Sequence, residues 1–176
     1  MCKEEFLEKI KNKPIYGIKS IYAHFLDFEI GEPCLKIDEL RKTTVRFKKY
    51  EDRLKFDQVY YDAQIKGEIH FSTEVFWKLK MKNKVICDAN VNHSEIEHIL
   101  NILLTGHSIK DIEIVKDKRN IVKILFSNNF ILYVTGKGKK CSDAWFSDKE
   151  YCAVFNGDKG YRYCLMTDSS DEGWIQ

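Results

Sequence analysis

Five histidines are the side chains best suited to general acid–base chemistry in this sequence: His24, His70, His93, His98 and His107. Imidazole titrates near neutral pH, so a histidine beside a carboxylate can move a proton during a reaction. His24 and His70 fall in predicted strands. His93 and His107 flank a predicted helix, which separates them by about 20 Å. An enzyme would therefore need an unfamiliar site, with His24 or His70 beside a carboxylate in a deep pocket.

Familiar catalytic motifs are missing from the sequence. It has no GxSxG elbow, no Walker loop, no GxGxxG after a strand and no HExxH. A hydrolase, nucleotide-binding enzyme or zinc peptidase of a common type usually carries one of these motifs. We therefore expect a protein that is not an enzyme, has no catalytic residues and needs no cofactor.

The six cysteines are too far apart to suggest a metal site: Cys2, Cys34, Cys87, Cys141, Cys152 and Cys164. A zinc site needs Cys or His pairs two to five residues apart. His93 and His98 come nearest, but their spacing places them on different sides of a helical turn. We expect no metal, and reduced thiols that pack mostly as small apolar side chains.

Acidic and aromatic residues gather towards the C-terminal end. From residue 143 onward, carboxylates outnumber the basic side chains. Tryptophan often anchors protein interfaces, and flanking carboxylates steer a basic partner. The predicted partner-binding residues are Asp143, Trp145, Asp148, Asp168, Asp171, Glu172 and Trp174. The structural alternative is a polar terminus in which Trp174 folds back on the domain.

Basic residues gather between residues 110 and 140. The loops KDKRN (116–120) and TGKGKKC (135–141) could form a patch that contacts phosphates. The second loop does not lead into a helix, so it lacks the helix dipole of phosphate-binding loops. A nucleic-acid or nucleotide site is the alternative prediction, using Lys116, Lys118, Arg119, Lys137, Lys139 and Lys140. Ordinary solvated hairpin loops would give the same pattern.

A second lysine pattern alternates along residues 76–84, FWKLKMKNK. A period of two predicts a strand with Trp77, Leu79 and Met81 on one face and the lysines on the other. Four lysines on one face could bind phosphates, or could keep a sheet edge solvated and unpaired. We favour the second interpretation. The lysines concerned are Lys78, Lys80, Lys82 and Lys84.

The chain has the composition of a globular protein. It contains 176 residues, of which 44% are hydrophobic, and carries a net charge of +2 that by itself demands neither nucleic acid nor an anionic membrane. The length suits a single domain, 1–176, with possible sub-units 1–90 and 91–176. The sequence starts without the apolar run of a signal peptide and has no run of about 18 apolar residues. We expect a cytoplasmic protein.

The second half predicts one helix followed by strands. SEIE at residues 94–97 reads as a capping box, apolar residues then recur at helical spacing, and Gly106 ends a helix predicted over 94–105. Asn128 and Asn129 suit a two-residue turn with positive φ angles. The strands predicted for a single meander are 109–115, 121–126, 130–134, 151–155 and 161–166.

The first half reads as a weaker copy of this pattern. A helix over 4–11 precedes a GIKSI strand, a strand over 25–30, a GEP turn and a returning CLKI strand. Residues 4–37 and 94–134 thus predict an α-β-β-β pseudo-repeat. Chance similarity of short apolar strands is the alternative. Further strands are predicted at 43–47, 68–71, 75–81 and 85–87. The predicted fold class is α+β, with mainly antiparallel sheets and two short helices.

One segment resembles a known family. FLDFEIGEPCLKI, residues 25–37, is similar to an FLxFxFGxPxLxI stretch near the start of a family of small bacterial proteins. The likeness in element order spans residues 17–166, although the family's Trp-rich middle strand matches IHFSTEVFWKL poorly. That family has no established activity, so the resemblance implies no catalytic residues.

The chain also resembles, in size and α+β make-up, the immunity proteins encoded beside bacterial polymorphic toxins. That likeness implies a protein partner, a toxin encoded next to it, which an acidic and aromatic surface would bind and block. We therefore expect an immunity-protein or antitoxin function. Nucleic-acid binding is the less favoured alternative, and a membrane partner is not expected.

Overall fold

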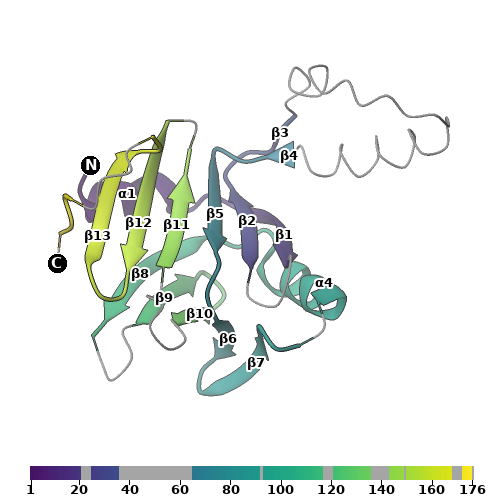
Figure 1. Cartoon of the computed structure of the whole chain (residues 1–176). Helices are drawn as coiled ribbons and strands as arrows, with labels where there is room; N and C mark the ends of the chain where they lie inside the picture. The colour runs from purple at the N-terminus through teal and green to yellow at the C-terminus, as the bar shows by residue number, and fades with distance from the viewer. Residues whose placement is uncertain are drawn as a thin grey trace, which may run out of the picture.

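The computed structural model describes residues 1–20, 25–35, 65–91, 93–116, 121–135, 143–148, 150–167 and 172–175. These residues form an α+β fold whose two main sheets are antiparallel, as predicted (Figure 1). A short ladder joins β3 (Cys34–Leu35) to β4 (Ile65–Lys66). Predicted strand 43–47 lies outside the described residues.

The larger sheet has six strands. Its order is β1 (Ile15–Ser20), β2 (Leu26–Ile30), β5 (Ile69–Thr73), β11 (Asp143–Ser147), β12 (Tyr151–Asn156) and β13 (Gly160–Leu165). The smaller sheet has five strands, in the order β7 (Lys84–Asp88), β6 (Trp77–Met81), β10 (Phe130–Thr135), β9 (Ile121–Phe126) and β8 (Ile109–Val115). The two sheets lie against each other in Figure 1.

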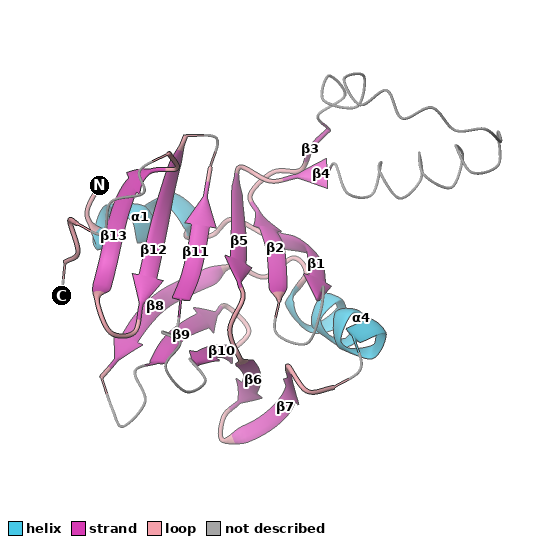
Figure 2. Ribbon diagram, in the orientation of Figure 1, coloured by secondary structure: helices cyan, strands magenta, loops and turns pink. Residues whose placement is uncertain are grey.

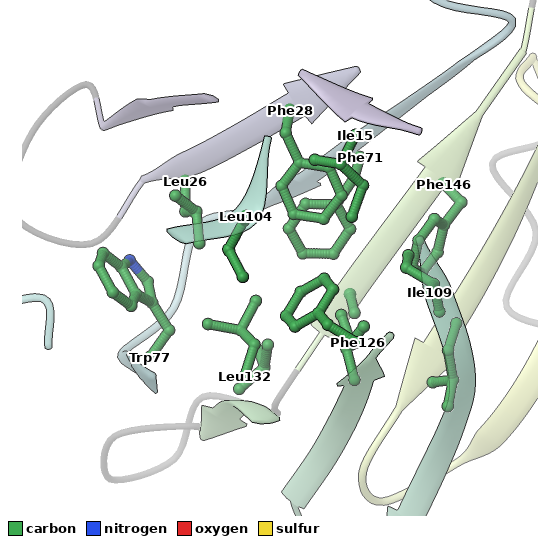
Figure 3. Close-up of a cluster of buried hydrophobic side chains, with 14 of the residues drawn as sticks. Ile15, Leu26, Phe28, Phe71, Trp77, Leu104, Ile109, Phe126, Leu132 and Phe146 are labelled. Atoms are coloured by element: carbon green, nitrogen blue, oxygen red, sulfur yellow. The ribbon is translucent and has the colours of Figure 1, made fainter. Parts of the chain in front are cut away.

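The core fills the space between the two sheets. Side chains alternate along the strands, most regularly in β9 and β10, where every second residue is buried in the core. Phe28 and Phe71 stack with their ring centroids 4.2 Å apart, and Phe126 of the smaller sheet meets Phe28 edge-on at 6.3 Å. Figure 3 shows Phe28 and Phe71 on one side of the core, with Phe126 and Leu132 on the other. The burial of these large apolar side chains holds the sheets together.

Two helices pack at the ends of the sandwich, and Figure 2 shows them in cyan. The first, α1 (Lys3–Ile10), inserts Phe6 among Phe146, Phe155 and Tyr161 of the larger sheet. The second, α4 (His93–Leu104), buries Ile96, Leu100 and Leu104 and packs beside β1. The predicted helix 94–105 is confirmed to within one residue, and Gly106 follows it at φ 82°.

Helix α4 covers the edge of β1, and one of its side chains makes the hydrogen bonds that a neighbouring strand would make. The Asn101 amide donates to the Ile18 carbonyl at 2.9 Å, and its Oδ1 accepts from the Ile18 N–H at 3.3 Å. Glu97 accepts from the Ser20 N–H at 2.8 Å. Beyond the helix, the Gly106 N–H donates to the Ile15 carbonyl and the Ile15 N–H to the His107 carbonyl, both at 2.8 Å. These contacts satisfy backbone groups that an open edge would expose.

The two halves of the chain exchange strands. Each half runs through a helix and three antiparallel strands of one sheet, α1-β1-β2-β5 and α4-β8-β9-β10, and then crosses to the other sheet. The first half continues there as β6 and β7, and the second as β11, β12 and β13. Each crossing strand pairs with the other half, β6 with β10 and β11 with β5. The predicted sub-units 1–90 and 91–176 are therefore interleaved in both sheets.

Two buried threonines mark the points where the chain changes sheet. The Thr73 hydroxyl, at the end of β5, donates to the Asp143 carbonyl at 2.7 Å. The Thr135 hydroxyl, at the end of β10, donates to the Phe76 carbonyl at 3.2 Å, and the Thr135 N–H donates to the same carbonyl at 2.7 Å. Each threonine thus ties one half of the chain to the other at equivalent positions.

Two strand predictions are wrong in detail. The segment after the GEP turn does not pair with β2, because β5 occupies that position and Cys34–Leu35 pairs with β4. The single five-strand meander is also wrong, because β11 lies between the two predicted hairpins and the strands divide between two sheets. In both cases the true partner is remote in sequence, where local turn signals carry no information.

Two turn predictions need a smaller correction. The β9–β10 hairpin is confirmed, but three residues connect its strands and only Asn129 has a positive φ, 67°. The four-lysine face is interrupted, because Lys82 lies in the β6–β7 turn at φ 55° and Lys84 begins the next strand. Lys78 and Lys80 alone share the outward face of β6.

Candidate outer-face site

The outward face of the six-stranded sheet carries two rows of side chains that cross all six strands. We call this surface the outer face. Strand register places one side chain from every strand opposite the next. The Trp145 row contains Lys19, Asp27, Ser72, Trp145, Val154 and Arg162. The His70 row contains Tyr16, Glu29, His70, Ser147, Cys152 and Cys164.

A bulge in β1 keeps both rows on one face. The register shifts between Tyr16 and Lys19, which are three residues apart and would otherwise point to opposite sides. Gly17 takes up the extra residue at φ 61°, a left-handed conformation that glycine adopts without strain. Tyr16 and Lys19 therefore both face outward. They lie opposite Glu29 and Asp27 of β2, respectively.

Trp145 protrudes from the middle of its row. Its side chain is 45% exposed, although it sits on a central strand. The residues directly opposite are the small Ser72 on β5 and Val154 on β12. An indole surrounded by smaller side chains is the form that an interface anchor takes. The sequence-based choice of Trp145 thus falls on an accessible aromatic side chain.

A buried carboxylate holds His70 in place beside this tryptophan. Glu29 is only 8% exposed, and its Oε1 lies 2.9 Å from His70 Nδ1. Its Oε2 accepts from the Gly67 N–H at 2.9 Å. Gly67 is required there, because a Cβ would come within 2.5 Å of the Ile30 carbonyl oxygen. With Nδ1 engaged, His70 presents its Nε2 as the atom left for a partner.

The His70–Glu29 pair was not predicted. His70 was only a general candidate, and Glu29 had no sequence signal of its own. Their Cα atoms are register partners across β2 and β5. Ser147 is the next residue in the row and is the register partner of His70 on β11. The arrangement therefore orients the imidazole through Glu29.

Asp143 lies on the outer face in a half-buried position. The Asn156 amide donates to its Oδ1 at 2.5 Å. Burial nevertheless raises the pKa of the Asp143 carboxyl above its ordinary value. The Asp143 carboxylate is therefore partly desolvated.

Asp148 points to the other side of the sheet. It pairs with Lys9 of α1 at 2.8 Å and accepts from the backbone N–H groups of Glu150 and Tyr151 at 2.9 and 2.8 Å. Burial alone would raise its pKa, but these donors outweigh burial and the pKa of Asp148 is lowered. This carboxylate connects α1 to the β11–β12 turn and does not share a surface with Trp145.

Replacing each of these two carboxylates with a neutral asparagine should affect the stability of the protein differently. We expect Asp148→Asn to lower the free energy of unfolding at pH 7 by about 1 kcal/mol, because it loses the partly buried ion pair. A carboxyl whose pKa is lowered by folding stabilises the folded state at pH values above its unfolded pKa, and this effect is lost as the pH falls through the folded pKa. The deficit of the variant should therefore be smaller at a pH below the ordinary value of 3.8 than at pH 7.

Asp143→Asn is the matched comparison. Because the pKa of Asp143 is raised in the folded state, ionisation of this carboxyl lowers the stability of the wild type. The free energy of unfolding of the variant at pH 7 should therefore equal that of the wild type or exceed it by up to about 0.5 kcal/mol. Urea denaturation at both pH values measures the two differences. A deficit for Asp143→Asn as large as that for Asp148→Asn would contradict the assignment.

The remaining acidic and aromatic predictions separate. Trp174 packs over Lys159 Nζ at 5.5 Å and the Arg162 guanidinium at 6.0 Å, and Ile175 pairs with Tyr161 through two hydrogen bonds of 2.8 Å. The terminal segment therefore folds back on β13, which is the structural alternative for Trp174. Glu172 is exposed. Asp168 and Asp171 lie outside the described residues.

The predicted basic patch falls largely on segments that the structure does not describe. Lys116 is exposed at the end of β8. Outside the described residues lie Lys118, Arg119, Lys137, Lys139 and Lys140. A different basic cluster is visible on the smaller sheet, where three ammonium groups lie 4.9 to 5.8 Å from the Tyr133 ring centroid. They belong to Lys78, Lys80 and Lys123.

The remaining histidines are dispersed. His98 is exposed on α4, and His107 Nδ1 lies 3.3 Å from the Ser127 hydroxyl. His24 lies outside the described residues. Within the described ranges, no three His, Cys, Asp or Glu side chains are grouped to hold a metal ion. Neither described helix is long and apolar enough to cross a membrane.

No protein-family model, curated protein or solved structure matches this chain.

Proposed function

We propose that this chain is a non-enzymatic, cytoplasmic protein that binds another protein, in the manner of a bacterial immunity protein or antitoxin. Its partner is a toxin encoded next to it, which it neutralises by binding. The exposed Trp145 at the centre of the outer face carries the proposal. A sheet face with a central indole and small neighbours supplies the anchor and the surrounding contact area of a protein interface.

The charges around Trp145 indicate what the partner presents. Asp27 lies in the same row, and Asp143 precedes Trp145 by two residues on the same side of β11. Lys19 and Arg162 stand at the two ends of the row, on the outermost strands. The centre of the interface is thus more acidic than its ends. A partner that places a lysine or arginine against the indole would gain both a cation–π contact and charge complementarity.

Alanine replacement of Trp145 tests this proposal. We expect the purified wild type to bind the product of the adjacent gene and to protect cells from it. Trp145→Ala should weaken that binding by about 30-fold or more, which corresponds to a hot spot of about 2 kcal/mol. Binding is measured by titration calorimetry, and the unchanged thermal unfolding temperature of the variant shows that it folds.

Tyr151→Ala is the control for this experiment. Tyr151 is also an exposed aromatic, at 38%, but it stacks on Tyr163 on the other side of the sheet. Its replacement should leave the affinity within about twofold. The proposal fails if the adjacent gene product does not bind the wild type, or if Trp145→Ala binds as tightly as the wild type does.

Nucleic-acid binding is the second candidate, favoured by the lysines around Tyr133. Three cations beside an aromatic ring on a solvated sheet resemble a surface for a single strand, with phosphates on the ammonium groups and a base on the ring. Glu113, 3.7 Å from Lys123, partly neutralises this cluster. A labelled oligothymidylate in the same titrations separates the candidates, because binding through phosphates weakens steeply with salt.

A further inference from the structure

The His70 row ends in a pair of cysteines that face each other across two strands. Cys152 of β12 and Cys164 of β13 are direct register partners. Their sulfur atoms lie 3.3 Å apart, and neither takes part in a disulfide. The sequence predicted only separate apolar thiols, because the two residues are twelve positions apart in the chain. Strand pairing brings them into contact.

The ladder geometry allows a covalent bond between these sulfur atoms. The Met166 N–H donates to the Glu150 carbonyl at 2.8 Å. Glu150 and Met166 are thus a hydrogen-bonded pair of the antiparallel ladder. Such pairs recur every two residues along the strands, so Cys152 and Cys164 form one as well, with Cα atoms about 5.5 Å apart. Disulfides bridge Cα separations of about 4.4–6.8 Å. Closing the bond requires the sulfurs to approach by about 1.3 Å, which side-chain rotation can supply.

The two sulfurs differ in their access to solvent. Cys164 is partly exposed, while Cys152 is buried beneath its neighbours. A small oxidant therefore reaches Cys164 first and leaves Cys152 in place to complete the reaction. Cys87 provides a contrast, because it is buried in the core and burial raises the pKa of its thiol to about 11. A thiol that does not ionise is a poor nucleophile.

We propose that Cys152 and Cys164 form a redox-sensitive dithiol that a low-molecular-weight disulfide, such as glutathione disulfide, converts to an intramolecular disulfide. The Cys164 thiolate attacks one sulfur of the oxidant, which forms a mixed disulfide and releases one glutathione thiolate. The Cys152 thiolate then attacks Cys164 and releases the second. The two protons lost by the protein thiols pass to the two glutathione thiolates, so one disulfide is reduced as one forms.

This chemistry is independent of the proposed partner. The dithiol shares the outer face with Trp145, but its oxidation needs no bound protein. It adds a modification site to a surface otherwise assigned to binding. Disulfides in cytosolic proteins are usually transient, which fits a pair of thiols whose sulfur atoms lie 3.3 Å apart and can close.

Thiol mapping after exposure to glutathione disulfide tests the proposal. The reduced full-length protein is incubated with the oxidant, quenched in acid, alkylated and analysed by peptide mass spectrometry. We expect a mass loss of about 2 Da and a linked peptide joining residues 152 and 164, formed at least about tenfold faster than any modification of Cys87. The unfolding temperature should rise by about 5 °C, and dithiothreitol should reverse both changes.

Serine variants provide the matched controls. Cys152→Ser should stop at a glutathione adduct on Cys164, and Cys164→Ser should form no linked peptide and show no thermal shift. The proposal is overturned if the wild type accumulates an adduct at Cys164 without the link, or if neither cysteine reacts before Cys87. Because the wild-type reaction is itself decisive, the result stands whether or not either variant folds.

Discussion

Phe146→Ala is expected to lower the free energy of unfolding by about 4 kcal/mol. Phe146 is 1% exposed, and its ring centroid lies 5.4 Å from Phe6, 5.0 Å from Phe71 and 5.6 Å from Phe155. It therefore joins α1, β5 and β12 at one point. Removing the ring leaves a cavity that three separate elements surround, and they cannot all move inward to fill it. A loss of this size is a large part of the stability of an ordinary domain.

The neighbouring residue supplies the control. Trp145 has more side-chain volume than Phe146 but points to solvent, so Trp145→Ala should change stability by no more than about 0.5 kcal/mol. Urea denaturation followed by circular dichroism measures both variants. Equal losses at 145 and 146 would contradict the assignment of inward and outward faces on β11. Comparing these two variants also separates folding from binding, because only Trp145→Ala should keep its stability while its affinity for the partner falls.

Asn101→Ala should cost about 2–3 kcal/mol and act on the edge of β1 rather than on the core. Asn101 donates to the carbonyls of Ile18 and Glu97 and accepts from the Ile18 N–H and the Thr105 hydroxyl. Alanine leaves the Ile18 backbone groups without these bonds in a half-buried position, where an unmade hydrogen bond carries a desolvation penalty. The variant should also aggregate sooner, because it opens a strand edge.

Hydrogen exchange localises this effect. In Asn101→Ala, hydrogen exchange at the Ile18 amide should become at least about tenfold faster, while the exchange rates of amides in β9 should change only as far as global stability changes. Asn90→Ala is the matched control, because Asn90 is exposed and only its backbone N–H takes part in a described hydrogen bond, to Asp88. Unchanged exchange at Ile18 would show that Asn101 does not cover the edge.

The sequence was most informative where structure is local. Residues 109–115, 121–126 and the helix that starts at His93 were predictable because apolar spacing and capping residues act within a few positions. The strand Asp143–Ser147 was missed because DAWFS is short and has polar residues at both ends. Its place in the sheet depends on pairing with Ile69–Thr73, which no local signal specifies.

The candidate site was predictable only in part. Trp145 could be chosen by residue type, because tryptophan often anchors protein interfaces and this one lies in the acidic C-terminal region. Strand register brings the other residues of the site together, Glu29 with His70 and Cys152 with Cys164. Reasoning from a single sequence does not provide that register. Asp148 was grouped with Trp145 because the two are close in sequence, yet β-strand alternation and Lys9 turn its side chain to the opposite side.

The exchange of strands between the two halves has a consequence for synthesis on the ribosome. β5 needs β11, and β6 needs β10, so residues 69–81 emerge long before their partners. At about 5–20 residues per second, the roughly 70 residues between β5 and β11 take about 4–15 s to be translated. Throughout that delay the nascent chain carries two unfinished sheet edges. Its yield in the cell therefore depends on how well these edges are shielded until the second half arrives.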